Sequence, residues 1–311
     1  MDTLAKALIS RASGQSKLRV DDVVICEVDL AMIHDSGGPR RVKPILDRLQ
    51  RQVWDKDKIV VVTDHYVPAD NAETQAIQAL TKQWVQDQSI DKFYDEQGIC
   101  HVVLPERGHL APGLFCVGGD SHSPTGGAFG AYMFGIGATE MAGVLATGEI
   151  WIKVPETILM SWRNQLSAYV TAKDMMLAMC RKIGMGGGRY QAIQYAGQTI
   201  QALSMQERMT LSNMAAELGA QAGLIAPDEA TVAFVQAAGG TVPANWRDFQ
   251  IEAAESAENV MQFDAASLEP QIAAPHSPEN ADAADAFRNI SFDVAYIGAC
   301  TGAKYVDLAA A

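Results

Sequence analysis

Histidines and carboxylates recur together in the first 122 residues of this 311-residue chain. Three signals stand out: His34-Asp35, Asp64-His65 and Asp120-Ser121-His122, with His101 in the same region. A carboxylate beside a histidine stabilises imidazolium, raises its pKa and fixes its tautomer, which suits the pair to proton transfer. The sequence supplies these groups, but the fold decides which of them pair, because adjacent residues of a strand face opposite ways.

Each signal also has a structural interpretation. An isolated Asp-His dipeptide is common, whereas the glycine-flanked Asp120-Ser121-His122 favours a chemical role more strongly. Asn213 and Glu217 are four residues apart on a predicted helix and share a face, where by themselves they indicate a solvated pair. The glycines at 126–130 favour close backbone packing over phosphate binding, because no G-x-x-x-x-G-K-[ST] motif occurs. Two further histidines are expected to be structural or on the surface: His109 and His276.

Five cysteines are scattered along the chain without a C-x-x-C motif. An odd and scattered set indicates reduced thiols rather than a disulfide framework. Four of them are expected to be buried apolar thiols: Cys26, Cys100, Cys116 and Cys180. The fifth, Cys300, lies in a segment that is typical of the start of a metal-cluster site, residues 297–302. A cluster needs several thiolates, and no further cysteine follows.

The composition is that of a soluble globular protein, with 48% hydrophobic and 20% charged residues. The formal net charge of −13 argues against binding to nucleic acid, whose phosphates favour basic surfaces. The N-terminus does not resemble a secretory signal, and no apolar run is long enough to span a membrane. We therefore expect a cytoplasmic location, with no membrane or nucleic-acid partner.

Apolar runs alternate with helical patterns along most of the chain. Strands are expected at 23–28, 58–63, 98–104, 114–117, 157–162, 191–200 and 292–297. Helices are expected at 3–11, 39–52, 72–86, 137–148, 172–183, 205–218 and 227–237. This alternation predicts an α/β fold with a mainly parallel sheet, in which ligands bind beyond the carboxyl ends of the strands.

The same pattern predicts four segments. A first α/β domain, 1–155, contains the His/Asp acid–base residues, and a second α/β domain follows at 156–254. An irregular connection, rich in Ala, Glu, Asp and Pro, covers 255–290. Residues 291–311 are expected to start a third, cluster-binding domain that remains incomplete.

Several ordered motifs together resemble the aconitase superfamily, and the resemblance covers essentially the whole chain. Within it, the chain looks most like the large subunits of 3-isopropylmalate dehydratase, an enzyme of leucine biosynthesis, and of its homoaconitase-like relatives. The matching segments are 25–35, 62–65, 98–101, 118–130, 135–140, 203–217 and 297–301. The resemblance implies aconitase-like three-layer α/β/α domains and a hydro-lyase that removes and re-adds water on a hydroxy-dicarboxylate or tricarboxylate such as isopropylmalate.

The resemblance also implies roles for particular residues. Asp64 and His65 would handle the proton of the leaving hydroxyl group. His101 would pair with Asp120, and His122 with Glu217, around the bound water. Ser121 and Asn213 would orient the residues around this water, and His34 would contact the substrate.

The implied cofactor is a [4Fe–4S] cluster held by three cysteines, with an open iron as Lewis acid. Cys300 would be the first ligand, and the other two ligands come from a downstream C-x-x-C that this chain lacks. The resemblance therefore implies a C-terminally truncated chain that is inactive by itself. The implied partner is a separate, swivelling small subunit in a heterodimer or heterotetramer, which supplies a serine base and a carboxylate-binding arginine.

One departure from the family bears on the substrate. The usual Cys-Thr-Asn-Gly is replaced by Cys300-Thr301-Gly302-Ala303-Lys304, so the asparagine beside the cluster is missing. This favours a paralogue acting on another malate-type substrate such as a dimethylmalate. Three further hypotheses are an inactive fragment without a cluster, an RNA-binding relative, which the acidic charge disfavours, and a mononuclear metal hydrolase that uses the His/Asp groups.

Overall fold

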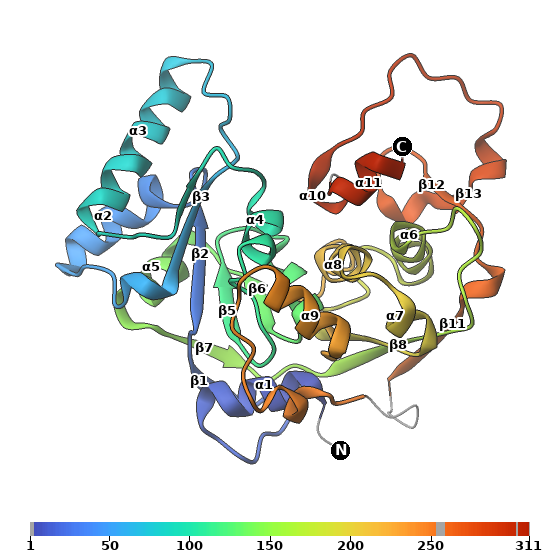
Figure 1. The fold of residues 1–311 in the computed structure, drawn as a ribbon, viewed down its shortest axis with the longest axis horizontal. Helices are drawn as coiled ribbons and strands as arrows, with labels where there is room; N and C mark the ends of the chain where they lie inside the picture. Colours follow the sequence, from blue (N-terminus) through green and yellow to red (C-terminus); the bar gives the residue numbers. More distant parts are fainter. Residues whose placement is uncertain (1–2, 253–258, 303, 311) are drawn as a thin grey trace.

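The computed structural model describes residues 3–252, 259–302 and 304–310. It confirms the predicted α/β class, because two parallel sheets dominate the fold (Figure 1). The larger sheet has the strand order β4-β3-β2-β5-β6, with every neighbouring pair parallel. Its strands are β2 (Leu30–His34), β3 (Ile59–Thr63), β4 (Phe93–Asp95), β5 (Phe115–Gly118) and β6 (Tyr132–Gly135).

Both faces of the larger sheet are covered, which explains why β2, β3 and β5 consist of continuously buried residues. Ile33 and Val61 pack into one apolar cluster with α2 (Pro39–Leu49), α3 (Ala72–Asp87) and α5 (Ala138–Thr147). Met32 and Val60 face the opposite cluster, together with α4 (Cys100–Glu106) and α8 (Met205–Asn213). The larger sheet therefore forms the middle of three layers.

The smaller sheet has the order β10-β9-β8-β11 and is also parallel. Its strands are β8 (Thr157–Arg163), β9 (Ala192–Ala196), β10 (Ala222–Ile225) and β11 (Val260–Asp264). The helices that connect or follow these strands are α6 (Ala172–Ile183), α7 (Gln198–Ala202), α8 and α9 (Glu229–Ala237). An apolar cluster that contains Trp162, Met176 and Leu211 joins this sheet to α6 and α8.

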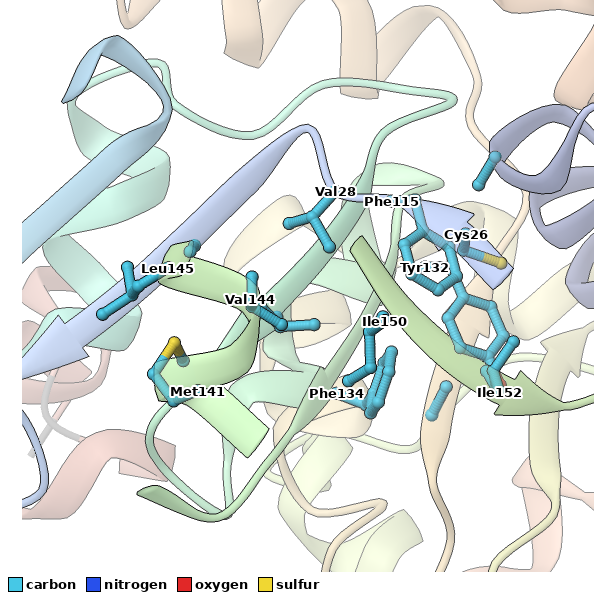
Figure 2. Close-up of a cluster of buried hydrophobic side chains, with 14 of the residues drawn as sticks. Cys26, Val28, Phe115, Tyr132, Phe134, Met141, Val144, Leu145, Ile150 and Ile152 are labelled. Atoms are coloured by element: carbon cyan, nitrogen blue, oxygen red, sulfur yellow. The ribbon is translucent and has the colours of Figure 1, made fainter. Parts of the chain in front are cut away.

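An antiparallel ribbon of β1 (Val23–Glu27) and β7 (Glu149–Lys153) lies beside α1 (Leu4–Ser13). Its strands alternate between buried and exposed residues, so one face packs on the protein and the other is open. Figure 2 shows Cys26, Ile150 and Ile152 of the inner face beside Phe115 and Tyr132 of the larger sheet. The strand predicted at 23–28 is therefore present, but only alternate residues of it are buried.

Local capping explains where several helices begin and end. Gly14 adopts the left-handed conformation that ends α1, with φ of 68°. Ser204 and Glu207 form a capping box at the start of α8, and Asp228 caps α9. The side chain of Asn71 caps α3 in the same way.

The structure corrects four of the predicted elements. Residues 98–104 were predicted as a strand, but residues 100–104 form the first part of α4, because the Cys100 N–H donates to Asp64 and the helix buries Val103 and Leu104. The predicted helix at 205–218 ends at Asn213, and turns follow. The predicted strand at 191–200 ends at Ala196, and α7 begins at Gln198.

The fourth correction concerns 292–297, which was predicted as a strand but forms none, because its alternating apolar side chains are exposed and no described strand pairs with it.

The region from 255 to 290 contains short elements besides β11, namely β12 (Gln271–Ala273) and β13 (Ala281–Ala283). The first four residues of that region, 255–258, lie outside the described residues. The last two helices are α10 (Ala299–Gly302) and α11 (Tyr305–Ala310). Within the described residues, no helix has the length and apolar character needed to cross a membrane.

Candidate active site

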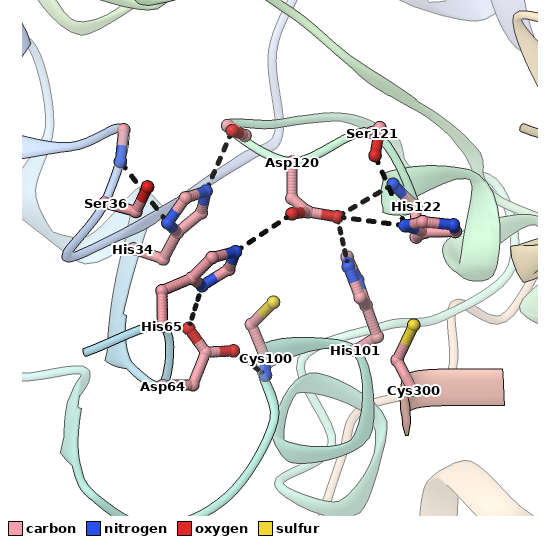
Figure 3. Close-up of polar contacts among 12 residues, drawn as sticks. His34, Ser36, Asp64, His65, Cys100, His101, Asp120, Ser121, His122 and Cys300 are labelled. Carbon is pink, nitrogen blue, oxygen red and sulfur yellow. Dashed lines mark hydrogen bonds and ion pairs between the residues drawn. The ribbon is translucent and has the colours of Figure 1, made fainter. Parts of the chain in front are cut away.

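The predicted acid–base residues meet at one edge of the larger sheet. His34 is the last residue of β2, Asp64-His65 follows β3 directly, and Asp120-Ser121-His122 follows β5. Because the three strands are parallel neighbours, their carboxyl ends lie side by side. His101 joins the group from the first turn of α4 (Figure 3).

Asp120 is the centre of this group. Its Oδ1 lies 2.6 Å from His101 Nε2 and accepts the backbone N–H of His122 at 2.8 Å, while its Oδ2 lies 3.3 Å from His65 Nε2. Burial by itself would raise the pKa of this carboxyl group. The hydrogen bonds from His101, His122 and His65 outweigh burial and hold the Asp120 pKa well below its usual range.

His65 is held between two carboxylates. Its Nδ1 lies 2.7 Å from Asp64 Oδ1, and its Nε2 faces Asp120. The hydrogen bonds to Asp120 and Asp64 outweigh the effect of burial and raise the His65 pKa to about 10, so the ring is an imidazolium at neutral pH. His65 pairs with its own sequence neighbour because Asp64-His65 lies beyond the end of β3, where the alternation of a strand no longer applies.

Asp64 connects this pair to α4. Its Oδ2 accepts the N–H of Cys100 at 2.7 Å, at the first residue of the helix. Burial opposes ionisation of Asp64, but the hydrogen bonds from His65 and Cys100 lower its pKa. One carboxylate thus orients His65 and fixes the helix that carries His101.

Asp35 is a residue of this site to which the sequence analysis assigned no role. Its side chain is fully buried, and its two oxygens accept backbone N–H groups from the loop after β3: those of Asp64, His65 and Tyr66. Asp35 therefore shapes the loop that presents Asp64 and His65. Its place beside His34 at the end of the central strand β2 was the signal that could have found it.

His34 lies flat against His65, with ring centres 3.9 Å apart and an angle of 12° between the planes. Its Nε2 lies 2.9 Å from the Gly119 carbonyl oxygen, to which a neutral ring can donate. Burial, together with the charge on His65, lowers the His34 pKa. His34 is therefore a neutral histidine beside a charged one.

The second expected pair, His122 with Glu217, is also present in the structure. His122 Nε2 lies 3.0 Å from Glu217 Oε1, and Ser121 Oγ lies 3.3 Å from His122 Nδ1. Hydrogen bonds with Asp120 and then Glu217 raise the His122 pKa to about 10. The other oxygen of Glu217 is buried and has no hydrogen-bond partner among the described residues.

The second part of the chain brings Asn213 and Cys300 to the same place. The Asn213 amide nitrogen lies 2.9 Å from Thr125 Oγ1 and 3.4 Å from Cys300 Sγ. Asn213 is buried, and Glu217 lies in the turn after α8, so the interpretation of these two residues as a solvated pair on one helix face was wrong. Figure 3 shows Cys300 near His101, on the side of the group away from His34.

The other cysteines and the glycines behave as the structural interpretation predicted. Four cysteines are fully buried: Cys26, Cys100, Cys116 and Cys180. A Cβ atom at Gly127 would lie 1.9 Å from the Gly223 carbonyl oxygen, so this segment packs closely on β10. His109 is structural as well, since its Nε2 contacts the hydroxyl group of Tyr94.

Two groups of side chains have the ligand types and spacing of a metal site: His34, Asp35, Asp64 and His65, and His101, Asp120 and His122. The carboxylates of both groups already form hydrogen bonds with histidines of the site or with backbone N–H groups. The arrangement is therefore better suited to holding protons than to binding a single ion. Fold and site together define an α/β protein with a cluster of paired histidines and carboxylates and one partly exposed cysteine, Cys300, at its edge.

Comparison with known proteins shows the family to which this chain belongs. The aconitase family (aconitate hydratase) matches residues 9–287. The probable 3-isopropylmalate dehydratase large subunit of Methanothermobacter thermautotrophicus is 39% identical over 98% of this chain and 73% of its own length. The 3-isopropylmalate dehydratase large subunit 1 of Methanopyrus kandleri is 41% identical, with 98% and 72% covered. The chain belongs to the aconitase family of hydro-lyases.

Two further similarities complete the comparison. The probable methanogen homoaconitase large subunit of Methanosarcina mazei is 39% identical over 92% of this chain and 72% of its own length. The crystal structure of Thermococcus kodakaraensis aconitase X in its holo-form aligns with a TM-score of 0.43 and 9% identity, over 85% of this chain and 63% of that one.

Proposed function

We propose that this chain is the large subunit of a hydro-lyase that dehydrates and rehydrates a hydroxy-dicarboxylate or tricarboxylate such as isopropylmalate. The observation that carries the proposal is the central position of Asp120, which contacts His65, His101 and the backbone of His122 at once. Removal of water needs a group that protonates the leaving hydroxyl group, and a histidine with fixed orientation is suited to that task.

We assign this proton transfer to His65. Its Nδ1 is held by Asp64 at 2.7 Å, whereas the contact of Nε2 with Asp120 is longer, at 3.3 Å. The Nε2 proton is therefore the one that can move to a leaving hydroxyl group, which departs as water while the serine base of the proposed small subunit takes the proton from the adjacent carbon and the double bond forms. In the reverse direction, His65 takes the proton back while Asp64 and Asp120 stabilise the imidazolium.

The remaining residues hold the water and the substrate. His122 and Glu217 would bind the released water, since Glu217 has a buried oxygen without a partner among the described residues. His101 keeps Asp120 ionised and in place. Ser121 and Asn213 would orient this shell, and His34 would contact the substrate.

We propose a [4Fe–4S] cluster as cofactor. The site offers a cysteine thiol, which is the right type of ligand, but only one of the three that the cluster needs. Cys300 is the one cysteine of this sequence that is partly exposed, and it lies beside Asn213 at the edge of the acid–base group. It would supply one thiolate ligand, and the other ligands would come from outside these 311 residues. When bound, the cluster would supply a Lewis-acidic iron for the substrate hydroxyl and carboxylate groups.

We also propose a small-subunit partner, because the relatives are named as large subunits. The proposed division into a first domain at 1–155 and a second at 156–254 would place Asn213 and Glu217 opposite the His/Asp residues of the first domain. A cytoplasmic location fits the five cysteines, none of which forms a disulfide in the structure.

Asp120→Asn in the complete, partnered and iron-loaded enzyme tests the proposal. The amide keeps the size of the side chain but cannot stabilise His65 as an imidazolium, so turnover of isopropylmalate should fall by about 10²–10⁴-fold. Loss of absorbance of the unsaturated product on hydration measures the rate, and the same change at exposed Asp70 is the control. A loaded wild-type enzyme that turns over no hydroxy-dicarboxylate or tricarboxylate would refute the proposal.

A further inference from the structure

A pocket of about 310 Å³ opens beside the acid–base group, at the carboxyl ends of β2 and β5. This volume lies at the lower end of the range for small-molecule sites. The pocket has a polar wall that contains His65, Asp120 and Ser121 and an apolar wall that contains Ile136 and Met141. The rim is completed by Arg41, from the first turn of α2.

Arg41 differs from its neighbour Arg40, whose guanidinium group is already engaged. Arg40 Nε donates to the Ser36 carbonyl oxygen at 2.9 Å, and its charge lies 5.5 Å from the centre of the Tyr66 ring. Arg41 is exposed, and within the part of the chain that the structure describes it has no carboxylate within 4.0 Å. Among these residues it is therefore a cation without a carboxylate partner at the mouth of the pocket.

The carboxylates around the pocket cannot easily become partners of Arg41. Asp35 is occupied by backbone N–H groups, and Asp120 by histidines. Glu140, at the start of α5, accepts the Gly137 N–H at 3.1 Å. The charge of His65 is balanced by Asp64 and Asp120, so Arg41 is the cation of the pocket lining that no carboxylate of the described residues pairs with, and it favours an anionic ligand.

We infer that Arg41 binds a carboxylate of the substrate in this pocket, with the alkyl substituent against Ile136 and Met141. A guanidinium group presents parallel N–H donors that match the two oxygens of a carboxylate. His65 and Asp120 line the same pocket, so a ligand held by Arg41 would place its hydroxyl group at the acid–base residues. The inference rests on the proposed function and adds to it a specificity-determining residue on this chain.

Arg41→Met and Arg41→Lys in the complete, partnered enzyme test the inference. A hydrogen bond to a charged group contributes about 1.5–3 kcal/mol, so the KM for the hydroxy-dicarboxylate should rise about 10–100-fold in Arg41→Met, with kcat changed less than about threefold. Arg41→Lys should recover part of the loss, because it keeps the charge but not the paired donors. Arg40→Met is the matched control and should leave KM unchanged.

The two half-amides of the substrate, each with one carboxylate neutralised, identify the group that Arg41 contacts. Wild-type enzyme should discriminate against one half-amide, and Arg41→Met should lose most of that discrimination. Equal KM values for wild type and Arg41→Met, with an active wild type, would overturn the role of Arg41 while leaving the proposed function intact. An inactive, fully loaded wild type would overturn both. Urea unfolding should show that Arg41→Met is folded, since the side chain is exposed.

Discussion

Lys304 Nζ lies 3.0 Å from Thr210 Oγ1, although the two residues are 94 positions apart in the chain. Lys304 is buried, and its Nζ also donates to the Thr301 carbonyl oxygen at 2.9 Å and lies 3.1 Å from Asp307. The Thr210 hydroxyl group donates to the same carbonyl oxygen. These contacts fasten the segment that carries Cys300 onto α8, three residues before Asn213.

Lys304→Met should loosen this segment, because it removes the ammonium group and keeps the length of the side chain. Cys300 is the one cysteine with partial exposure, so the rate of thiol labelling in the folded chain reports on it alone. We expect the labelling rate to rise about fivefold or more, since a buried hydrogen bond is worth on the order of 1 kcal/mol.

Thr210→Val and the double variant show whether the two residues act through one contact. Their effects on the labelling rate should then be clearly less than additive. Lys173→Met, the same change at an exposed lysine near Gly302, is the matched control. An unchanged labelling rate in Lys304→Met would show that the contact does not hold Cys300 in place.

His122→Ala should lower turnover of the complete enzyme by about a hundredfold or more, which is a typical acid–base contribution. Glu217→Gln should act more gently, because Asp120 still contacts His122 and the amide keeps the size of the side chain. Its expected effect is a shift of the alkaline limb of the kcat/KM profile to lower pH, as the His122 pKa falls. Glu229→Gln on the surface of α9 is the control. A near-wild-type rate in His122→Ala would contradict the assigned role.

The raised His122 pKa also predicts a pH dependence of stability. The pKa is about 10 in the folded protein and about 6.5 in an unfolded chain. Folding therefore favours the charged ring, and the stabilisation is complete below pH of about 6.5 and is lost as pH rises towards 10. The side chain is 28% exposed, so we expect a contribution on the order of 1 kcal/mol after solvent screening.

Urea unfolding of wild type and His122→Gln at pH 6 and pH 9.5 measures this contribution. The difference in the free energy of unfolding between the two proteins should be larger at pH 6 than at pH 9.5. His109→Gln is a useful comparison, because burial lowers the His109 pKa to about 4 and the sign of its dependence is reversed. A difference for His122→Gln that grows with pH would refute the proposed charge state.

Two strands of the larger sheet, β3 and β5, could be predicted because their residues are apolar without interruption. The other three strands, β2, β4 and β6, were not predicted. The buried run of β3 ends at Thr63, and the next two residues are Asp64 and His65, so the sequence alone places these groups at a strand end. The helix α4 could not be predicted, since its β-branched residues favour a strand and its first turn depends on a contact with Asp64. Tertiary packing outweighs local propensity there.

The pairing of the site residues could not be deduced from spacing. His101 and Asp120 are 19 positions apart, and His122 and Glu217 are 95 apart, so no local pattern connects them. The resemblance to a family supplied both pairs, and the structure contains them. For Asp35 the one signal was its place beside His34. Lys304 had no signal, because a buried charged residue is recognised only from the groups that surround it.

By the resemblance, Gly302 stands where the family has an asparagine that would lie beside the proposed cluster, and the structure leaves room for a larger side chain. A Cβ atom at Gly302 would have Lys173 Nζ, at 4.0 Å, as its nearest neighbour. Gly302→Asn should therefore leave the free energy of unfolding within about 0.5 kcal/mol of wild type. An amide close to Cys300 should change which malate-type substrate is preferred, because polar groups near the reacting atoms set specificity.

In the complete, partnered enzyme we expect Gly302→Asn to shift the ratio of kcat/KM for isopropylmalate over dimethylmalate about tenfold towards isopropylmalate. Gly302→Ala adds the Cβ atom without the amide, and should leave the ratio near its wild-type value. If both variants shift the ratio equally, the side-chain volume at this position decides the preference and the amide does not. If neither shifts it, Gly302 has no part in substrate choice, and the walls of the pocket beside Arg41 must account for it.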